Sequence, residues 1–191
     1  MLEAFGVSTA AVAIAEIGDK TQLLAIVLAA TFRKPVAILL GVLAATLLNH
    51  TIAAALGFAL GQWFEGRLFQ TVLGLSFVVM AAWALIPDKD DGAAARDRGG
   101  AFLTALIAFF FVEIGDKTQV ATSLLAARFQ DVATVTAGTT LGMMLANAPA
   151  VFLGEAVTKI APLRTIRMIA ALLFAVIGVC IVGAAWLAPA A

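Results

Sequence analysis

The sequence has little charge and few of the side chains on which catalysis depends. Charged residues make up 13% of its 191 residues, and it contains one His and one Cys. The formal net charge is zero, so the basic surface of a nucleic-acid-binding protein is missing. Neither a nucleophile–base pair nor a nucleotide-binding loop can be identified. We therefore expect a protein that is not an enzyme, carries no cofactor and binds no nucleic acid.

Hydrophobic residues, in contrast, make up 63% of the chain, against roughly 45–50% in soluble domains. A soluble domain of this size cannot bury so much apolar surface, so we expect the chain to lie in a lipid bilayer. A helix needs about 20 mostly apolar residues to cross one. Six segments qualify, at about residues 7–30, 36–61, 68–86, 101–126, 132–157 and 168–187. The predicted fold is an all-α membrane protein with six transmembrane helices.

The Lys and Arg residues of the connecting segments indicate an orientation. If the loops alternate between the two sides of the membrane, one side holds eight of these residues and the other holds two. The eight are Arg33, Lys34, Lys89, Arg96, Arg98, Lys159, Arg164 and Arg167, and the two are Arg67 and Arg128. The richer side is expected to be cytoplasmic. We predict a multi-pass protein of the bacterial inner (cell) membrane, with both termini outside and a cytoplasmic linker at residues 87–100. Met1 to Phe5 lack the positive charge of a signal peptide, so the first helix is expected to be retained.

A shift of 97 residues brings the two halves of the sequence into register. Residues 16–22 and 113–119 are then identical, and both read Glu-Ile-Gly-Asp-Lys-Thr-Gln. The same shift pairs Phe5 with Phe102, Gly41 with Gly138, and Phe77 with Phe174. Such agreement in all three predicted helices of each half indicates an internal duplication.

The duplication predicts how the chain is organised. The first half, residues 1–86, and the second half, residues 101–191, each contain three predicted helices. Because three is odd, the second half enters the membrane from the opposite side. Inverted repeats of this kind are typical of transporters, whose sites lie near the membrane midplane between the repeats. We predict two inverted three-helix repeats joined by the linker at residues 87–100.

Each copy of the motif brings three ionisable side chains to the middle of a predicted helix. They are Glu16, Asp19 and Lys20 in the first half, and Glu113, Asp116 and Lys117 in the second. An ionisable group at the bilayer centre costs roughly 2.5–3.5 kcal/mol, so these six must face one another, water or an ion. On a continuous helix the three groups of each copy share one face. Gly18 and Gly115 permit either a close helix crossing or a local break.

The four carboxylates of Glu16, Asp19, Glu113 and Asp116 form an oxygen-rich set that suits Mn²⁺, Ca²⁺ or Mg²⁺. With both lysines protonated, the two motifs carry a net charge of minus two, which one divalent ion neutralises. When the ion leaves, protons are the natural replacement, because carboxylates that lie close together bind protons more readily. The motif pair therefore predicts the exchange of a divalent cation for protons.

Other polar residues are candidates for supporting these ligands or relaying protons. They are Lys20, Thr21, Gln22, Asn49, His50, Lys117, Thr118, Gln119 and Asn147. The 97-residue shift pairs His50 with Asn147, and either could complete the coordination shell, while His50 could instead relay protons or bond a neighbouring helix. Met143 and Met144 lie one turn from Asn147, where packing and soft coordination are both open.

Two copies of Glu-φ-Gly-Asp-(Lys/Arg)-(Thr/Ser) in a six-span protein resemble the Golgi-type calcium/manganese–proton exchanger family. Its bacterial branch includes MneA-type manganese exporters. The resemblance covers both motifs, the helix count, the inverted halves and the charged linker. It implies that Glu16, Asp19, Glu113 and Asp116 bind the cation, and that Mn²⁺ leaves the cytoplasm, with Ca²⁺ as the other candidate.

Three alternatives remain at this stage. The protein could be a passive divalent-cation channel, although polar residues outside the motifs are few. It could be a membrane scaffold or assembly factor, for which a duplicated acidic motif has no evident use. The motifs could also be structural ion-pair networks, with Glu16 paired to Lys20 and Glu113 paired to Lys117. Nothing in the sequence predicts an oligomeric state.

Overall fold

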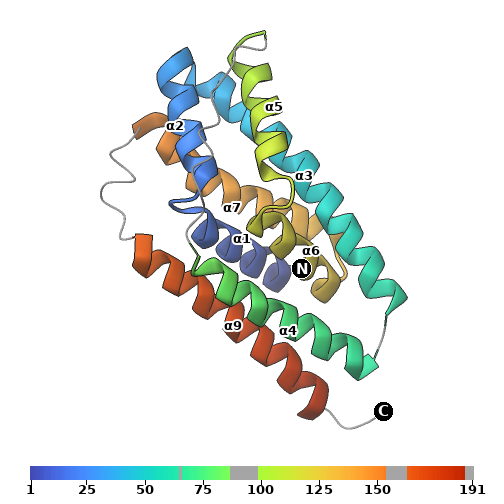
Figure 1. The fold of residues 1–191 in the computed structure, drawn as a ribbon. Coiled ribbons are helices and arrows are strands. Elements are labelled where there is room, and N and C mark those ends of the chain that lie inside the picture. The colour runs from blue at the N-terminus through green and yellow to red at the C-terminus, as the bar shows by residue number, and fades with distance from the viewer. Residues whose placement is uncertain (65, 87–98, 154–162, 188–191) are drawn as a thin grey trace.

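A computed structural model describes residues 1–64, 66–86, 99–153 and 163–187 (Figure 1). Within these ranges the regular structure is entirely α-helical, as predicted. The helices are α1 (Leu2–Glu16), α2 (Lys20–Phe32), α3 (Pro35–Trp63), α4 (Gly66–Ala84), α5 (Ala101–Glu113), α6 (Lys117–Phe129), α7 (Val132–Leu153) and α9 (Leu163–Leu187).

Four of the described helices are long and apolar enough to cross a membrane, namely α3, α4, α7 and α9. They correspond to four of the six predicted spans, although α9 begins at Leu163 rather than near residue 168. The last residues of the span predicted at 132–157 lie outside the described ranges. So do residues 87–98 of the predicted linker and, with them, several of the charges on which the orientation was predicted.

The other two predicted spans are not continuous helices, and this part of the prediction is wrong. The first is divided into α1 and α2, and the second into α5 and α6. Both divisions fall inside the repeated motif, at residues 17–19 and 114–116. The groups of each motif therefore do not share one helical face. Of the two roles open to Gly18 and Gly115, the local break is the one that the structure adopts.

The helices of the two halves pack against each other and do not form two separate bundles. α1 and α2 lie against α7, α5 and α6 lie against α3, and α3 contacts α7. Glycine makes the closest approaches possible. A Cβ on Gly41 in α3 would lie 2.5 Å from the carbonyl oxygen of Phe102, and a Cβ on Gly138 in α7 would lie 2.7 Å from that of Phe5. Residues that the 97-residue shift pairs thus make the same contact in both halves.

The last helix of each half, α4 and α9, run side by side (Figure 1). Phe77 of α4 meets Phe174 of α9, with ring centroids 6.4 Å apart and both rings buried. These two residues are also related by the 97-residue shift. The backbones of Gly74 and Gly178 touch beside them, because a Cβ on Gly178 would lie 2.5 Å from the Gly74 carbonyl oxygen.

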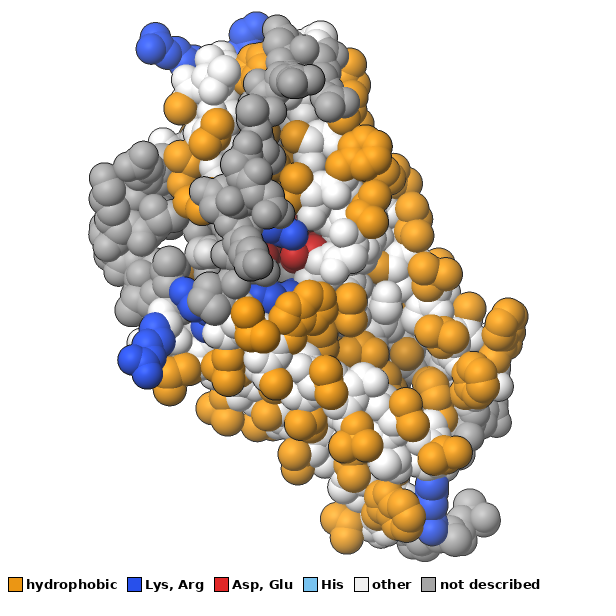
Figure 2. Space-filling model, viewed as in Figure 1, with side chains coloured by type: hydrophobic (Ala, Val, Ile, Leu, Met, Phe, Trp, Pro, Cys, Tyr) orange, Lys and Arg blue, Asp and Glu red, His pale blue; other side chains and the backbone are white. Residues whose placement is uncertain are grey.

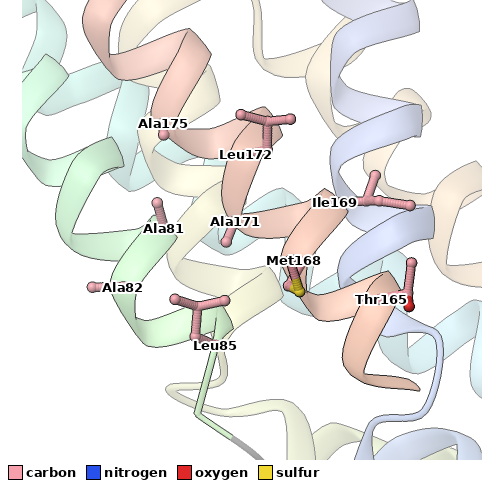
Figure 3. Close-up of a pocket in the computed structure, with 9 residues that line it drawn as sticks. All are labelled: Ala81, Ala82, Leu85, Thr165, Met168, Ile169, Ala171, Leu172 and Ala175. Carbon is pink, nitrogen blue, oxygen red and sulfur yellow. The ribbon is translucent and has the colours of Figure 1, made fainter. Parts of the chain in front are cut away.

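The outer surface is strongly apolar. In Figure 2 hydrophobic side chains are spread over the right and lower parts of the visible face, and a small patch near its middle combines acidic and basic side chains. A hollow of about 620 Å³ lies between α4 and α9, and Figure 3 shows the residues that line it. Thr165 supplies the only polar side chain among the described residues that line it. One hydroxyl group is too few ligands for a bare cation, and the candidate site is built around the repeated motifs.

Candidate functional site

Each motif forms a tight turn between two helices. In the first copy, Ile17 has φ −65° and ψ 118°, and Gly18 has φ 81°. These angles match a type II turn, whose third residue requires a positive φ of about 80° and is therefore normally glycine. The Asp19 N–H donates to the Glu16 carbonyl oxygen at 3.1 Å, which closes the turn.

The second copy repeats this geometry closely. Ile114 has φ −62° and ψ 118°, and Gly115 has φ 76°. The Asp116 N–H donates to the Glu113 carbonyl oxygen, again at 3.1 Å. Each turn therefore puts a glutamate at the end of one helix and an aspartate at the start of the next.

A glutamine side chain stabilises each turn by accepting a backbone hydrogen bond. The Gly18 N–H donates to Gln22 Oε1 at 2.9 Å, and the Gly115 N–H donates to Gln119 Oε1 at 2.6 Å. Gln22 also reaches across to the second half, because its Nε2 donates to the Ala146 carbonyl oxygen at 2.9 Å. From the sequence, these glutamines are expected only to support the ligands or relay protons. The signal for their role was present, since a glutamine follows each motif glycine by four residues.

Asp19 and Asp116 occupy the N-cap positions of α2 and α6. Asp19 Oδ1 accepts the Lys20 N–H at 2.7 Å. A carboxylate at a helix N-terminus is stabilised by the unpaired N–H groups there and by the helix dipole. The break in each helix thus provides a favourable place for a negative charge within a segment that is otherwise apolar.

The two motifs meet at their acidic side chains. Glu16, Asp19 and Asp116 each offer a carboxylate oxygen within 4.8 Å of the other two, and their exposed fractions are 0%, 4% and 3%. We call these three residues the carboxylate trio. Lys20 Nζ lies 3.0 Å from Asp116 Oδ1 and ties the two halves together. Neither carboxylate oxygen of Glu16 accepts a hydrogen bond from the described residues, so these residues do not show the alternative arrangement in which Glu16 pairs with Lys20.

The fourth predicted ligand, Glu113, lies beside His50 rather than within the trio. His50 Nε2 is 4.0 Å from Glu113 Oε2, and both side chains are fully buried. Asn147, the counterpart of His50, lies near Glu16 instead. Its Nδ2 donates to the backbone oxygen and to the sulfur of Met143, both at 3.1 Å. Each glutamate is therefore approached by the second helix of the opposite half.

The remaining candidates have varied surroundings. Asn49 Nδ2 donates to the Phe110 carbonyl oxygen at 3.0 Å, so this side chain joins α3 to α5. Lys117 Nζ donates to the Ile86 carbonyl oxygen at 2.8 Å. Thr118 Oγ1 donates to Asp116 Oδ2 at 3.4 Å, and Thr21 is buried. Met144 packs in the apolar core.

The chemistry of the trio fits a hard cation. A buried carboxylate without a compensating partner is costly, and Glu16 is such a group within the part of the chain that the structure describes. Oxygen ligands lie about 2.1–2.6 Å from such ions, so ligands on opposite sides of one ion are roughly 4–5 Å apart. The trio has this spread. It therefore has the spacing, charge and burial to hold one divalent ion.

Comparison with known proteins identifies relatives. The family described as divalent cation/proton antiporter GDT1 matches residues 4–92 and 101–188. A protein of Vibrio cholerae serotype O1 (strain ATCC 39541 / Classical Ogawa 395 / O395), which bears the name "Putative manganese exporter", is 46% identical over 175 residues. The aligned region covers 91% of this chain and 88% of that protein. No solved structure matches the chain.

Proposed function

Because this chain belongs to the divalent cation/proton antiporter GDT1 family, we propose that it exports Mn²⁺ from the cytoplasm in exchange for protons. The family is one of transporters, and the resemblance inferred from the two motifs is confirmed. The choice of Mn²⁺ and of the outward direction draws on the name of the Vibrio cholerae relative, which shares 46% of its residues with this chain.

The observation that carries the proposal is the buried carboxylate trio, to which both copies of the motif contribute. In this proposal Glu16, Asp19 and Asp116 bind the cation, and Glu113 is the fourth acid of the same charged cluster. Support comes from the 4.8 Å spread of the trio oxygens and from the two Glu16 oxygens, which accept no hydrogen bond from the described residues. A structural ion-pair network would not leave them so.

Charge balance explains why protons move the other way. With Lys20 and Lys117 protonated, the two motifs together carry a charge of minus two. One Mn²⁺ neutralises that charge. Without the ion, a water-poor interior disfavours so many ionised groups, and protons restore neutrality. A site that closes only when neutral then couples the two ions.

We further propose that the chain crosses the membrane six times as two inverted repeats, with α1 and α2 forming one crossing and α5 and α6 another. Four features support this proposal: the family match to both halves, the paired glycine contacts, the meeting of Phe77 with Phe174 and the identical turns. The linker at residues 87–100 is then cytoplasmic and both termini are outside. If the two repeats exchanged conformations, the site would open first to one side of the membrane and then to the other.

Ca²⁺ is the second candidate substrate. The trio offers only oxygen ligands, which both ions accept, so its chemistry favours neither. A passive channel has less support, because a continuous polar path would be needed and α4 and α9 supply mainly apolar side chains.

Transport by the purified protein in liposomes tests this proposal. Mn²⁺, Ca²⁺ and Mg²⁺ are supplied in turn, and saturable uptake of Mn²⁺ is expected. Asp19→Asn and Asp116→Asn should each abolish uptake while leaving membrane insertion intact, because removal of a buried charge eases insertion. The matched control is Asp131→Asn. Asp131 Oδ1 accepts the Thr134 N–H at 3.0 Å outside the site, and Asn serves equally well at the start of a helix.

Wild-type rates in either aspartate variant would remove that residue from the site. A channel would be favoured if the uptake rate did not saturate with Mn²⁺ concentration and did not change with an imposed proton gradient. Faster transport of Ca²⁺ than of Mn²⁺ would change the proposed substrate without changing the site.

A further inference from the structure

The hollow between α4 and α9 lies at one end of this helix pair. At the opposite end, Trp186 Nε1 donates to Thr71 Oγ1 at 3.0 Å and joins the end of α9 to the start of α4. The two helices are therefore antiparallel. Figure 3 shows Leu85 near the end of α4 and Met168 near the start of α9, and both residues line the hollow. The hollow is thus at the end where α4 finishes and α9 begins.

Small side chains explain the open space. The backbones of α4 and α9 touch at Gly74 and Gly178, beside the buried rings of Phe77 and Phe174. Toward the hollow, alanines take the place of these aromatic residues. They are Ala81 and Ala82 on α4, and Ala171 and Ala175 on α9. The space that remains, about 620 Å³, is in the range of pockets that hold small ligands.

The residues that line the hollow favour an apolar occupant. Thr165 is the only polar side chain among those that the structure describes there, whereas a buried water molecule needs two to four polar partners. Apolar walls with nothing between them lose dispersion contacts. Both α4 and α9 are long and apolar enough to cross a membrane, where the surrounding apolar material is the hydrocarbon of lipids. An acyl chain therefore fits the hollow better than water or an ion does.

Two arginines lie at the same end of α9. Arg164 and Arg167 each precede by four residues a residue that lines the hollow, namely Met168 and Ala171. On a helix, residues three or four apart share a face, and long side chains point back toward the start of the helix. Both arginines therefore extend from the hollow toward the end of the helix. Arg164 is exposed and Arg167 is half-buried, and neither guanidinium forms an ion pair with a described residue.

This pair of positive charges is unfavourable by itself. Like charges one helical turn apart repel each other, and the helix dipole disfavours cations near the start of a helix. A phosphate group would offset both effects, because guanidinium groups bind phosphate through paired hydrogen bonds. Basic sites between transmembrane helices bind anionic lipid headgroups in this way. An anionic phospholipid combines an acyl chain for the hollow with a headgroup for the arginines.

We propose that the hollow between α4 and α9 binds an acyl chain of one anionic phospholipid, whose phosphate is held by Arg164 and Arg167. This lipid site is separate from the carboxylate trio and does not depend on which cation is transported. In the proposed orientation α9 begins on the cytoplasmic side, so the lipid belongs to the cytoplasmic leaflet.

Native mass spectrometry of the purified full-length protein tests the headgroup contact. The protein is mixed in detergent with equal amounts of phosphatidylglycerol, which is anionic, and phosphatidylcholine with the same acyl chains. Wild-type protein should retain phosphatidylglycerol in preference. The double variant Arg164→Gln/Arg167→Gln should reduce this preference by about 25-fold, since one basic residue near an anionic headgroup contributes about fivefold in affinity.

The matched control is Arg33→Gln/Lys34→Gln. Both residues are exposed and lie between α2 and α3, on the same proposed side of the membrane, so the variant removes the same charge at another place. Glutamine suits position 33, because the equivalent Gln130 has φ 52° and Arg33 has φ 53°. The control should keep the wild-type lipid preference.

A second pair of variants tests the acyl chain. Ala82 is exposed and lines the hollow, so Ala82→Phe places a ring where the chain would lie. This variant should lose the bound phosphatidylglycerol although both arginines remain. Val72→Phe is its control, because Val72 is 54% exposed on α4 and does not line the hollow. Thermal unfolding in detergent, recorded for every variant, shows that each is folded.

Equal retention of the two lipids by wild-type protein would mean unspecific surrounding lipid and would overturn the proposal. Undiminished phosphatidylglycerol binding in the double arginine variant, or in Ala82→Phe, would overturn it as well. A wild-type dimer that Ala82→Phe converts to a monomer would show that a second copy of the chain covers the hollow instead. Lipid retention is measured without metal, so its outcome is independent of the Mn²⁺ transport that tests the proposed function.

Discussion

One added methyl group at Gly115 tests whether the turn inside the motif is required. Gly115 has φ 76°, and a Cβ built on it would meet nothing within 4 Å. Substitution by alanine therefore causes no clash, and its whole effect comes from the backbone. A left-handed conformation costs an L-residue roughly 1–2 kcal/mol. Gly115→Ala should lower the stability of the metal-bound protein by about this amount.

The loss can be measured as a thermal shift. For a chain of this size, 1 kcal/mol corresponds to about 2–4 °C in Tm, so Gly115→Ala in saturating Mn²⁺ should melt about 2–8 °C below wild type. If the turn relaxes when metal is absent, part of the loss appears as weaker binding. At 1.4 kcal/mol per tenfold, the weakening would be at most about 30-fold.

Gly6→Ala is the matched control. A Cβ on Gly6 also meets nothing within 4 Å, but this residue lies within α1, where alanine is favoured over glycine by about 1 kcal/mol. This variant should melt at the wild-type temperature or higher. If Gly115→Ala matched Gly6→Ala in Tm, Mn²⁺ affinity and transport, the turn would not determine the position of Asp116.

Two further predictions follow from the paired contacts and from the charge distribution. Gly41→Ala and Gly138→Ala each push a methyl group against a backbone carbonyl, at 2.5 Å and 2.7 Å, and should destabilise the protein by about 1–3 kcal/mol each. A large thermal shift in only one of them would contradict the equivalence of the two contacts. A cysteine introduced at residues 87–100, with the exposed Cys180 replaced by serine, should resist an impermeant reagent applied to intact cells. Ready labelling would reverse the proposed orientation.

The broad features of the fold could be predicted because they depend on composition and duplication. Apolar segments long enough to span a bilayer can be recognised without a structure, and an identical stretch of residues in both halves indicates which elements are equivalent. The same reasoning predicts that the ionisable groups within apolar segments find partners, and Glu16, Asp19 and Asp116 do lie together, whereas Glu113 lies beside His50.

The break at the motif was harder to predict. The spacing of Glu16, Asp19 and Lys20 fits one face of a continuous helix as well as it fits a helix end followed by an N-cap. Local pattern does not choose between these, and Gly18 was compatible with both. Gln22 accepts a hydrogen bond from the Gly18 N–H in the turn. Its position four residues after the glycine was the one sequence feature that favoured a broken helix over a continuous one.

The contacts between the two halves could not be predicted from the sequence. Lys20 pairs with Asp116 across the site, whereas spacing along a helix suggested Glu16. His50 and Asn147 were recognised as equivalent positions, yet their places near different glutamates depend on how α3 and α7 pack. Such long-range geometry arises from the packing of whole helices and not from any local signal.

The central claim is that one cluster of carboxylates carries the divalent cation and the protons in opposite directions. Liposomes that contain the purified protein and an internal pH-sensitive dye test it most directly, with Mn²⁺ supplied on the outside only. Mn²⁺ entry should drive protons out and raise the internal pH, and Asp116→Asn should abolish both signals together. Mn²⁺ uptake without a pH change, at several starting pH values, would contradict exchange.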